Sequence, residues 1–348
     1  MNLSNLISIK DKNNPNLIEL SFSKAKHFMR CKKRYDYRYN QKLTKKTKSL
    51  PLRRGSWIHE CLETYYRDGD WKIGYEDYLK ETWKKMFDEE KVEYGDLPQE
   101  IERIIKGYIK KYNKQDSQYK VIAVEQEFEI QIPGTNVVLT GVIDLIIQDA
   151  LGIWIIDHKS VKNIPTEEFR LTDTQLSIYY WVVQKLKPYL KIDKDTKISG
   201  VMFNYIRTKV PTKPQVLKNG GLSKRKDIDC DYDTYYNAII ENGLNPEDYL
   251  DMLALVSNKK FYIRRQLPKS SAMVKEVILD LIEIGENILD LKVKQRYPRN
   301  FTRDCSWDCE FKDLCISELH GHDIQFIIEN EFEEYKKKEK EDKNDDNE

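Results

Sequence analysis

Apolar residues follow a helical spacing in some segments of the chain and a strand-like alternation in others, and these patterns predict its helices and strands. Helical spacing begins at Ser21 or Ser23, either of which can cap the first helix. The further segments with helical spacing are 52–66, 74–91, 97–115, 173–187, 231–243, 246–256, 271–294 and 323–338. Alternating or β-branched runs predict strands, which cover 121–130, 137–147, 153–159 and 198–206, with a shorter one at 260–265.

The order of these elements is helices, a three-strand meander, a helix, another strand and more helices. This order predicts an α/β or α+β core with large helical additions. The segments that we expect are a loose lead-in (1–20), a helical basic region (21–118), a core (119–206), a basic loop (207–228), a helical region with cysteines (229–322), and a terminal helix with a charged, disordered tail (323–348).

Charge is unevenly distributed, although the net charge of the 348 residues is only +1. Thirteen Lys or Arg and one acidic residue, Asp36, lie between Lys24 and Arg54, with tyrosines interleaved. A second basic stretch runs from Lys209 to Lys226. Basic segments with aromatic residues suit a nucleic-acid backbone, whereas the alternative is a solvated helix face followed by a flexible loop.

Neither a membrane span nor a secretion signal is visible. No stretch approaches the roughly eighteen apolar residues of a membrane-spanning helix, and the N-terminus does not have the pattern of a signal peptide. We therefore expect a cytoplasmic protein, in bacteria or in a phage-infected host. In such a reducing compartment the six cysteines are expected to be free thiols or metal ligands.

Two apolar strand-like runs each contain an acidic residue. Asp144 lies in G-V-I-D-L-I-I, and Asp157 lies in W-I-I-D-H-K with Lys159 two residues later on the same strand face. A carboxylate in a buried strand is costly to desolvate unless it binds a cation or a polar partner. Mg²⁺ and Mn²⁺ prefer such oxygen ligands. A structural ion pair between Asp157 and Lys159, or an edge strand with both groups solvated, explains the spacing equally well.

These runs resemble motifs II and III of the PD-(D/E)XK nuclease superfamily in its RecB-like branch. R-G-S-W-I-H-E resembles the upstream G-x-x-x-H motif with Gly55 and His59, and Q-L-S-I-Y resembles the downstream Q-x-x-x-Y motif with Gln175 and Tyr179. V-E-Q-E-F, with Glu125, resembles the first core strand. The resemblance covers roughly residues 21–320 and implies a restriction-endonuclease-like core, in which helices flank a mixed central sheet.

The resemblance also implies the roles of individual residues. Asp144, Asp157, the backbone carbonyl of His158 and His59 would hold Mg²⁺ or Mn²⁺, and Lys159 would be the catalytic lysine. Gln175 and Tyr179 lie four residues apart on one predicted helix face. They would contact the substrate backbone or support Lys159. Glu125 and its strand-face neighbour Glu127 are either site residues or plain surface charge.

Three cysteines lie within eleven residues of irregular chain: Cys305, Cys309 and Cys315. Such spacing indicates a metal or cluster site that needs a fourth ligand. An iron–sulfur subgroup of the RecB-like branch, which includes AddB-type and CRISPR-associated adaptation nucleases, has one cysteine before the core and three after it. By resemblance Cys31 is the fourth ligand of a [4Fe–4S] cluster. The usual triplet is C-x2-C-x5-C, whereas the first gap here is three residues, so zinc and free thiols stay open.

The leading interpretation is a metal-dependent exonuclease that hydrolyses single-stranded DNA or duplex ends in recombination, repair or phage DNA processing. The chain has no Walker A motif, so ATP-driven unwinding would come from a helicase or recombinase partner. The alternatives are a non-catalytic DNA-binding scaffold subunit with a nuclease fold, an endonuclease that acts on structured DNA, and a redox-sensing cluster protein.

Overall fold

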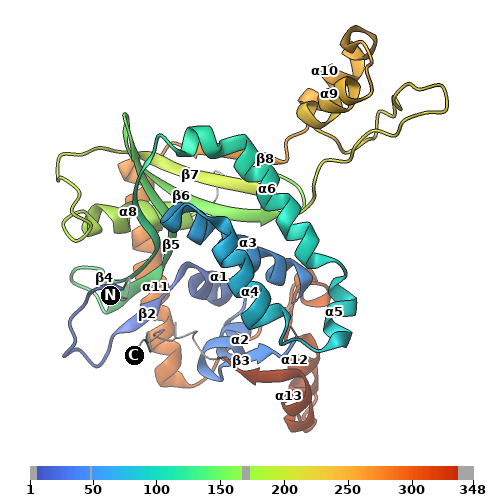
Figure 1. Cartoon of the computed structure of the whole chain (residues 1–348). Helices are drawn as coiled ribbons and strands as arrows, with labels where there is room; N and C mark the ends of the chain where they lie inside the picture. Colours follow the sequence, from blue (N-terminus) through green and yellow to red (C-terminus); the bar gives the residue numbers. More distant parts are fainter. Residues whose placement is uncertain (1–5, 48, 167–172, 336–348) are drawn as a thin grey trace, which may run out of the picture.

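A seven-stranded mixed sheet forms the centre of the protein (Figure 1). The computed structural model describes residues 6–47, 49–166 and 173–335. The sheet strands are β1 (Ile7–Ile9), β2 (Ile18–Leu20), β4 (Lys120–Gln131), β5 (Val137–Asp149), β6 (Gly152–Val161), β7 (Ile198–Arg207) and β8 (Tyr262–Leu267). Six of them follow the order β1-β4-β5-β6-β7-β8, and β2 pairs with β5.

Helices surround this sheet, as the sequence predicts. Those of the described residues are α1 (Phe22–Arg30), α2 (Lys32–Tyr35), α3 (Leu50–Asp68), α4 (Trp71–Tyr78), α5 (Asp88–Tyr94), α6 (Leu97–Asp116), α8 (Gln175–Leu186), α9 (Tyr232–Glu241), α10 (Leu250–Ser257), α11 (Ser271–Lys294), α12 (Lys312–Leu319) and α13 (Gln325–Glu331). Ser21 rather than Ser23 caps α1, because its side chain accepts a hydrogen bond from the backbone N–H of Lys24. The expected single helix over 74–91 is divided into α4 and α5, and three acidic residues favour the new helix start at Asp88.

Strand directions explain the position of α8. Strands β4, β5 and β6 form an antiparallel meander, whereas β6 and β7 run parallel. A parallel pair needs a crossover connection, and α8 lies in the segment that joins these two strands. The predicted meander, crossover helix and mixed sheet are confirmed.

The sheet is covered on both faces. Alternate residues of β6 point to opposite sides, so Ile153 and Ile155 pack in one apolar core and Trp154 and Ile156 pack in another. The first core contains residues of α1, α8 and α11, and the second contains residues of α3 and α6. Burial on both faces is the reason that β5 and β6 read as almost continuous apolar runs.

The expected loose lead-in of residues 1–20 contains two short strands within its described part, residues 6–20. β1 pairs in parallel with β4, and β2 pairs in parallel with β5. Ile18 and Leu20 are buried in the core below α11. Strands of three residues are too short to show a periodic pattern, so only the long-range pairing identifies them.

The C-terminal helix is shorter than the expected 323–338. It ends at Glu331, and the chain continues as β9 (Phe332–Glu334), which pairs antiparallel with β3 (Leu43–Lys45). Phe332 is buried and stacks on Phe311, and the pairing of β3 with β9 attaches this C-terminal segment to residues 43–45. The tail predicted to be disordered lies outside the described residues beyond 335.

Candidate active site and cysteine pocket

Asp144 and Asp157 lie on neighbouring strands and are both almost fully buried. Asp157 is 1% exposed and Asp144 is 9% exposed. The Oδ2 atom of Asp144 accepts a hydrogen bond of 2.6 Å from the backbone N–H of His158, which links β5 to β6. Burial raises the pKa of Asp157 to about 7, with a further contribution from the negative charge of Asp144. Two buried acids held this close to each other form a site that favours a cation.

Lys159 connects the acidic strands to helix α8. Its Nζ atom lies 2.7 Å from Oδ2 of Asp157 and donates a hydrogen bond of 2.9 Å to Oε1 of Gln175. The Nε2 atom of Gln175 donates in turn to the hydroxyl of Tyr179 at 2.8 Å. Burial lowers the pKa of Lys159, but the charge of Asp157 outweighs this and raises it, so the ammonium stays charged. The four predicted residues thus form one chain of contacts.

His59 reaches the same place from helix α3 on the other side. Gly55, one turn earlier, allows the close approach, because a Cβ atom there would lie 3.0 Å from Oγ of Ser160. The Nε2 atom of His59 lies 3.0 Å from the carbonyl oxygen of His158, and its Nδ1 atom lies 3.8 Å from Oδ2 of Asp144. The structure therefore brings the upstream histidine to the carbonyl that the family resemblance implies as a metal ligand.

Glu125, which the sequence leaves undecided, lies in the site. Its backbone has a φ of +47°, which is unusual for a residue with a side chain and is a common form of local strain at functional sites. Its Oε1 atom is 3.9 Å from Nδ1 of His59. Among the described residues, His59, Glu125 and Asp144 form the one group of three whose ligand atoms lie within 4.8 Å of one another.

The donors of this group fit a divalent cation. Carboxylate and carbonyl oxygens suit Mg²⁺ and Mn²⁺, and an imidazole is also a common ligand of transition metals. Burial lowers the pKa of His59, but Asp144 and Glu125 outweigh it and raise the pKa to about 9. The raised pKa reflects the negative charge that Asp144 and Glu125 gather around His59, and a divalent cation would compensate the same charge.

Behind β6 lies a polar network that the sequence does not identify as part of the site. Burial lowers the pKa of His158, so its ring is neutral. The ring accepts at Nδ1 from Nδ2 of Asn204 at 2.7 Å, and Asn204 also donates to the hydroxyl of Tyr108 at 2.8 Å. Arg264 donates to the same hydroxyl at 2.7 Å and lies 2.7 Å from Oδ1 of Asp116. These contacts hold the strand segment whose carbonyl faces the metal group.

Only one member of this network leaves a signal in the sequence. Asn204 is a polar residue inside the apolar run of β7 and is fully buried. Tyr108, Asp116 and Arg264 come from α6 and β8 and have no pattern that connects them to β6.

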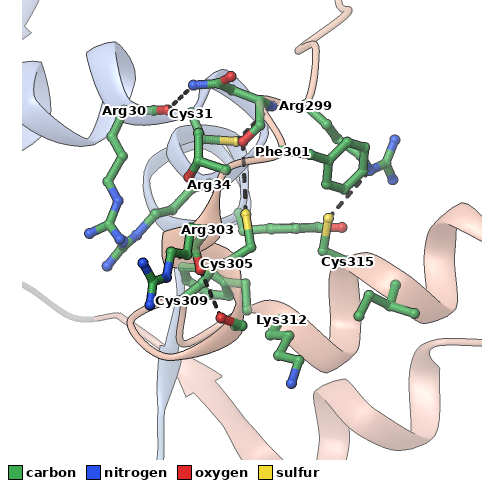
Figure 2. Close-up of a pocket in the computed structure, with 16 residues that line it drawn as sticks. Arg30, Cys31, Arg34, Arg299, Phe301, Arg303, Cys305, Cys309, Lys312 and Cys315 are labelled. Atoms are coloured by element: carbon green, nitrogen blue, oxygen red, sulfur yellow. Dashed lines mark hydrogen bonds between the residues drawn. The ribbon is translucent and has the colours of Figure 1, made fainter.

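The four predicted cluster ligands line a single cavity of about 290 Å³ (Figure 2). Cys31 follows α1, Cys305 and Cys309 lie in the irregular segment before α12, and Cys315 is on α12. The Sγ atom of Cys31 lies 3.5 Å from the backbone nitrogen of Asn300. Segments separated by nearly the whole sequence thus place their thiols together.

The sulfur atoms of the pocket are spread out, and the remaining two cysteines of the chain lie elsewhere. Although all four cysteines are described, no three of their sulfur atoms lie within 4.8 Å of one another. The Nε atom of Arg299 donates to Sγ of Cys315 at 3.3 Å. Cys61 and Cys230 are buried in separate apolar clusters.

Much of the N-terminal basic segment is neutralised inside the protein. Lys33 lies 2.9 Å from a carboxylate oxygen of Glu318, and Arg54 lies 2.6 Å from one of Glu100. The ion-paired residues of the segment are Arg30, Lys33, Arg34, Lys42, Lys45, Arg53 and Arg54. Most of their partners belong to the C-terminal segment, so this charge attaches the two ends of the chain.

Comparison with known proteins agrees with the geometry. The model of the PD-(D/E)XK nuclease superfamily matches residues 19–316 of the chain. This range includes His59, Glu125, the motif on β5 and β6, and all four pocket cysteines. No curated protein matches the chain. Within the described residues, no helix is both long and apolar enough to cross a membrane.

Proposed function

Because the chain belongs to the PD-(D/E)XK nuclease superfamily, we propose that it is a Mg²⁺- or Mn²⁺-dependent deoxyribonuclease. The observation that carries this proposal is the meeting of Asp144, Asp157 and Lys159, on the inner strands β5 and β6, with His59 of α3. A structural ion pair alone does not explain why His59 and Glu125 converge on the same buried carboxylate.

His59, Glu125, Asp144, Asp157 and the carbonyl of His158 are the groups that would hold the metal. The bound cation supplies positive charge to the scissile phosphate and lowers the pKa of the attacking water. The superfamily resemblance assigns His59, both aspartates and the carbonyl, and the position of Glu125 in the group supports adding it.

Lys159 is proposed as the catalytic lysine. Its ammonium can orient the water or stabilise negative charge that develops on the phosphate. Asp157 and Gln175 hold it from two sides, and Tyr179 fixes the amide of Gln175. A charged group that is held before the reaction needs little rearrangement during it, which is what electrostatic catalysis requires.

Digestion of labelled DNA with Mg²⁺, Mn²⁺ or EDTA tests the enzyme. We expect metal-dependent cleavage by the wild type and a loss of about 10²-fold or more in rate for Lys159→Met and Asp157→Asn, since each removes a charge used in the transition state. Lys185→Met and Asp280→Asn, two exposed positions on α8 and α11, are matched controls that should keep full activity. Metal-independent binding of DNA without cleavage by the wild type would instead establish the scaffold alternative.

We propose that the enzyme acts as an exonuclease on single strands or duplex ends, on the basis of the iron–sulfur relatives that the sequence resembles. Linear DNA labelled at the 5′ or the 3′ end should release short labelled products from one end only. Circular single-stranded DNA is the matched control and should stay intact. Cleavage of the circle would show an endonuclease.

The cysteine pocket is proposed to hold a [4Fe–4S] cluster. Zinc with Zn–S bonds of about 2.3 Å would require thiolates roughly 3.8 Å apart, whereas no three of these sulfur atoms lie within 4.8 Å. The cavity of about 290 Å³ between them favours the larger group. Zinc stays the alternative, and a redox-sensing role would require that cleavage change when the cluster is oxidised.

A further inference from the structure

An arm of residues 208–261 leaves the body of the protein between β7 and β8 (Figure 1). The sheet does not require it, because β7 and β8 pair directly from Val201 with Leu267 to Ile206 with Tyr262. A short turn would close such a pair. The chain instead contains an extended hairpin followed by α9 and α10.

The arm has a small apolar core of its own. Its buried residues are Leu222, Cys230, Tyr235, Ala238, Ile239, Tyr249, Met252, Leu253 and Val256. The hairpin is closed by a bridge between Val216 and Leu222 and a turn at Gly220, whose φ is +80°. The hydroxyl of Tyr249 accepts from the backbone N–H of Leu222 at 2.9 Å, which attaches the hairpin to the helices.

The hairpin carries a high density of positive charge. From Lys209 to Lys226 there is no acidic residue. The basic side chains, all exposed, are Lys209, Lys213, Lys218, Lys224, Arg225 and Lys226. Within the described part of the chain, Lys218, Lys224 and Lys226 make no ion pair, in contrast to most of the N-terminal basic segment. Lys224 does contact the arm itself, because its Nζ atom donates to the carbonyl of Asp248 and lies 4.8 Å from the ring centroid of Tyr249.

The helical part of the arm has the opposite charge. No Lys or Arg occurs from 227 to 258. The acidic residues of this range are Asp227, Asp229, Asp231, Asp233, Glu241, Glu247, Asp248 and Asp251. A polyanion is therefore attracted to the hairpin and repelled by the helices.

The root of the arm is close to the candidate active site. Lys159 on β6 pairs with Tyr205 on the parallel strand β7, and the arm begins three residues later at Thr208. The backbone N–H of Thr208 donates to the carbonyl of Val161 at 2.9 Å. At the rise of a strand, three residues span about 10 Å, so the arm leaves from the same end of the parallel strands β6 and β7 as Lys159.

We propose that the basic hairpin, residues 209–226, binds the phosphodiester backbone of DNA beyond the nucleotides that occupy the active site. This inference rests on the proposed function for the identity of the ligand. Exposed lysines that are not neutralised by the protein release counterions when they meet phosphates. The acidic helices restrict this contact to the hairpin side of the arm.

The test is DNA binding by the full chain without divalent metal, as a function of salt. The variant Lys218→Gln/Lys224→Gln/Lys226→Gln removes three positive charges that are in no ion pair of the described residues, and Lys218→Arg/Lys224→Arg/Lys226→Arg is its charge-preserving control. We expect at least about tenfold weaker binding of long duplex DNA by the Gln variant and a salt-dependence slope smaller by about 2 to 3. A long single strand tested in parallel distinguishes which form of the backbone is bound.

The Arg variant should bind with wild-type affinity and slope. The Gln variant should still cleave a short oligonucleotide that fills only the active site, at the wild-type rate. Equal affinity and slope for the Gln variant and the wild type, on both long substrates, would overturn the inference while leaving the nuclease proposal intact. Conversely, a wild type that never cleaves but binds through the hairpin would refute the enzyme and keep the inference.

Discussion

Because side chains alternate along β6, the proposed catalytic residues Asp157 and Lys159 lie on the opposite face from His158. Asp157 and Lys159 face α8, where Lys159 contacts Gln175. His158 lies between them and points to the opposite side, where its ring stacks on Tyr66 with ring centroids 5.7 Å apart. One short segment thus contributes a charged pair to one face and a neutral, buried ring to the other.

Asn204 is expected to position the His158 carbonyl through the ring that it contacts. Asn204→Ala leaves Nδ1 of His158 and the hydroxyl of Tyr108 without this donor. We expect Mn²⁺ affinity to fall by about tenfold or more, as for outer-shell partners of metal ligands. Calorimetric titration of Mn²⁺ measures this, with the exposed Asn237→Ala on the arm as the control.

A purely structural role of Asn204 gives a different result. Burying polar groups without partners lowers the free energy of unfolding by about 1–3 kcal/mol. If the variant melts at a lower temperature but binds Mn²⁺ and cleaves DNA like the wild type, the network stabilises the fold without positioning the metal group.

At the scale of the element, α11 lies close to the sheet because it carries a glycine at the contact. Gly285 is buried, and a Cβ atom there would lie 2.4 Å from Cγ2 of Val137 on β5. The helix also presents Val277, Ile278 and Leu281 to the same core. The glycine therefore sets the distance between helix and sheet.

Gly285→Ala is expected to destabilise the protein despite the better helix propensity of alanine. Alanine gains about 1 kcal/mol in a helix, whereas overpacking a core costs about 1–3 kcal/mol. Val137 is fully buried and β-branched, so it has little freedom to move. We expect a net loss in the free energy of unfolding, measured by urea denaturation. Glu286→Ala, the exposed neighbour, should change it by less than about 0.5 kcal/mol.

At the scale of the whole molecule, the beginning and the end of the chain form one structural unit. β3 pairs with β9, and Tyr37 packs with Phe311 in a small apolar core. The hydroxyl of Tyr37 donates to Glu318 at 2.8 Å. The cysteine pocket lies within this unit, so a group bound there closes almost the entire chain into a loop.

Cys31→Ala is expected to prevent binding of the proposed [4Fe–4S] cluster and to lower the stability of the protein. Cross-linking so long a loop contributes roughly 5 kcal/mol by chain entropy, and the other contacts of this unit will offset part of the loss. We expect the variant to lack the brown colour expected of a Cys₄ cluster and to melt at a lower temperature. Cys230→Ala, in the arm, is the control that should keep the colour. Wild-type protein that contains zinc and no iron would contradict the cluster.

Several features could be predicted from the sequence because they depend on local patterns. The spacing of apolar residues predicted the positions of β4 to β7. Asp144 and Asp157 were noticeable because each is an acidic residue within an apolar run. The structure places Gln175, Tyr179 and His59 around them, and it gathers the four cysteines that the resemblance implied.

Other features depend on contacts between distant segments, which no local pattern records. Residues 7–9 and 18–20 are strands because they pair with β4 and β5, which are distant in the sequence. The sequence could not decide between site and surface for Glu125, and its place beside His59 comes from the packing of α3 on the sheet. From the sequence, the basic residues near the N-terminus could be expected to face solvent or nucleic acid. In the fold, acidic residues of the C-terminal segment form ion pairs with them. The physical reason is that an ion pair or a strand pair forms with whichever groups the fold brings close, and these groups can be far away in the sequence. Burial of one face of a helix or strand, by contrast, requires apolar residues at a regular spacing, which the sequence itself shows.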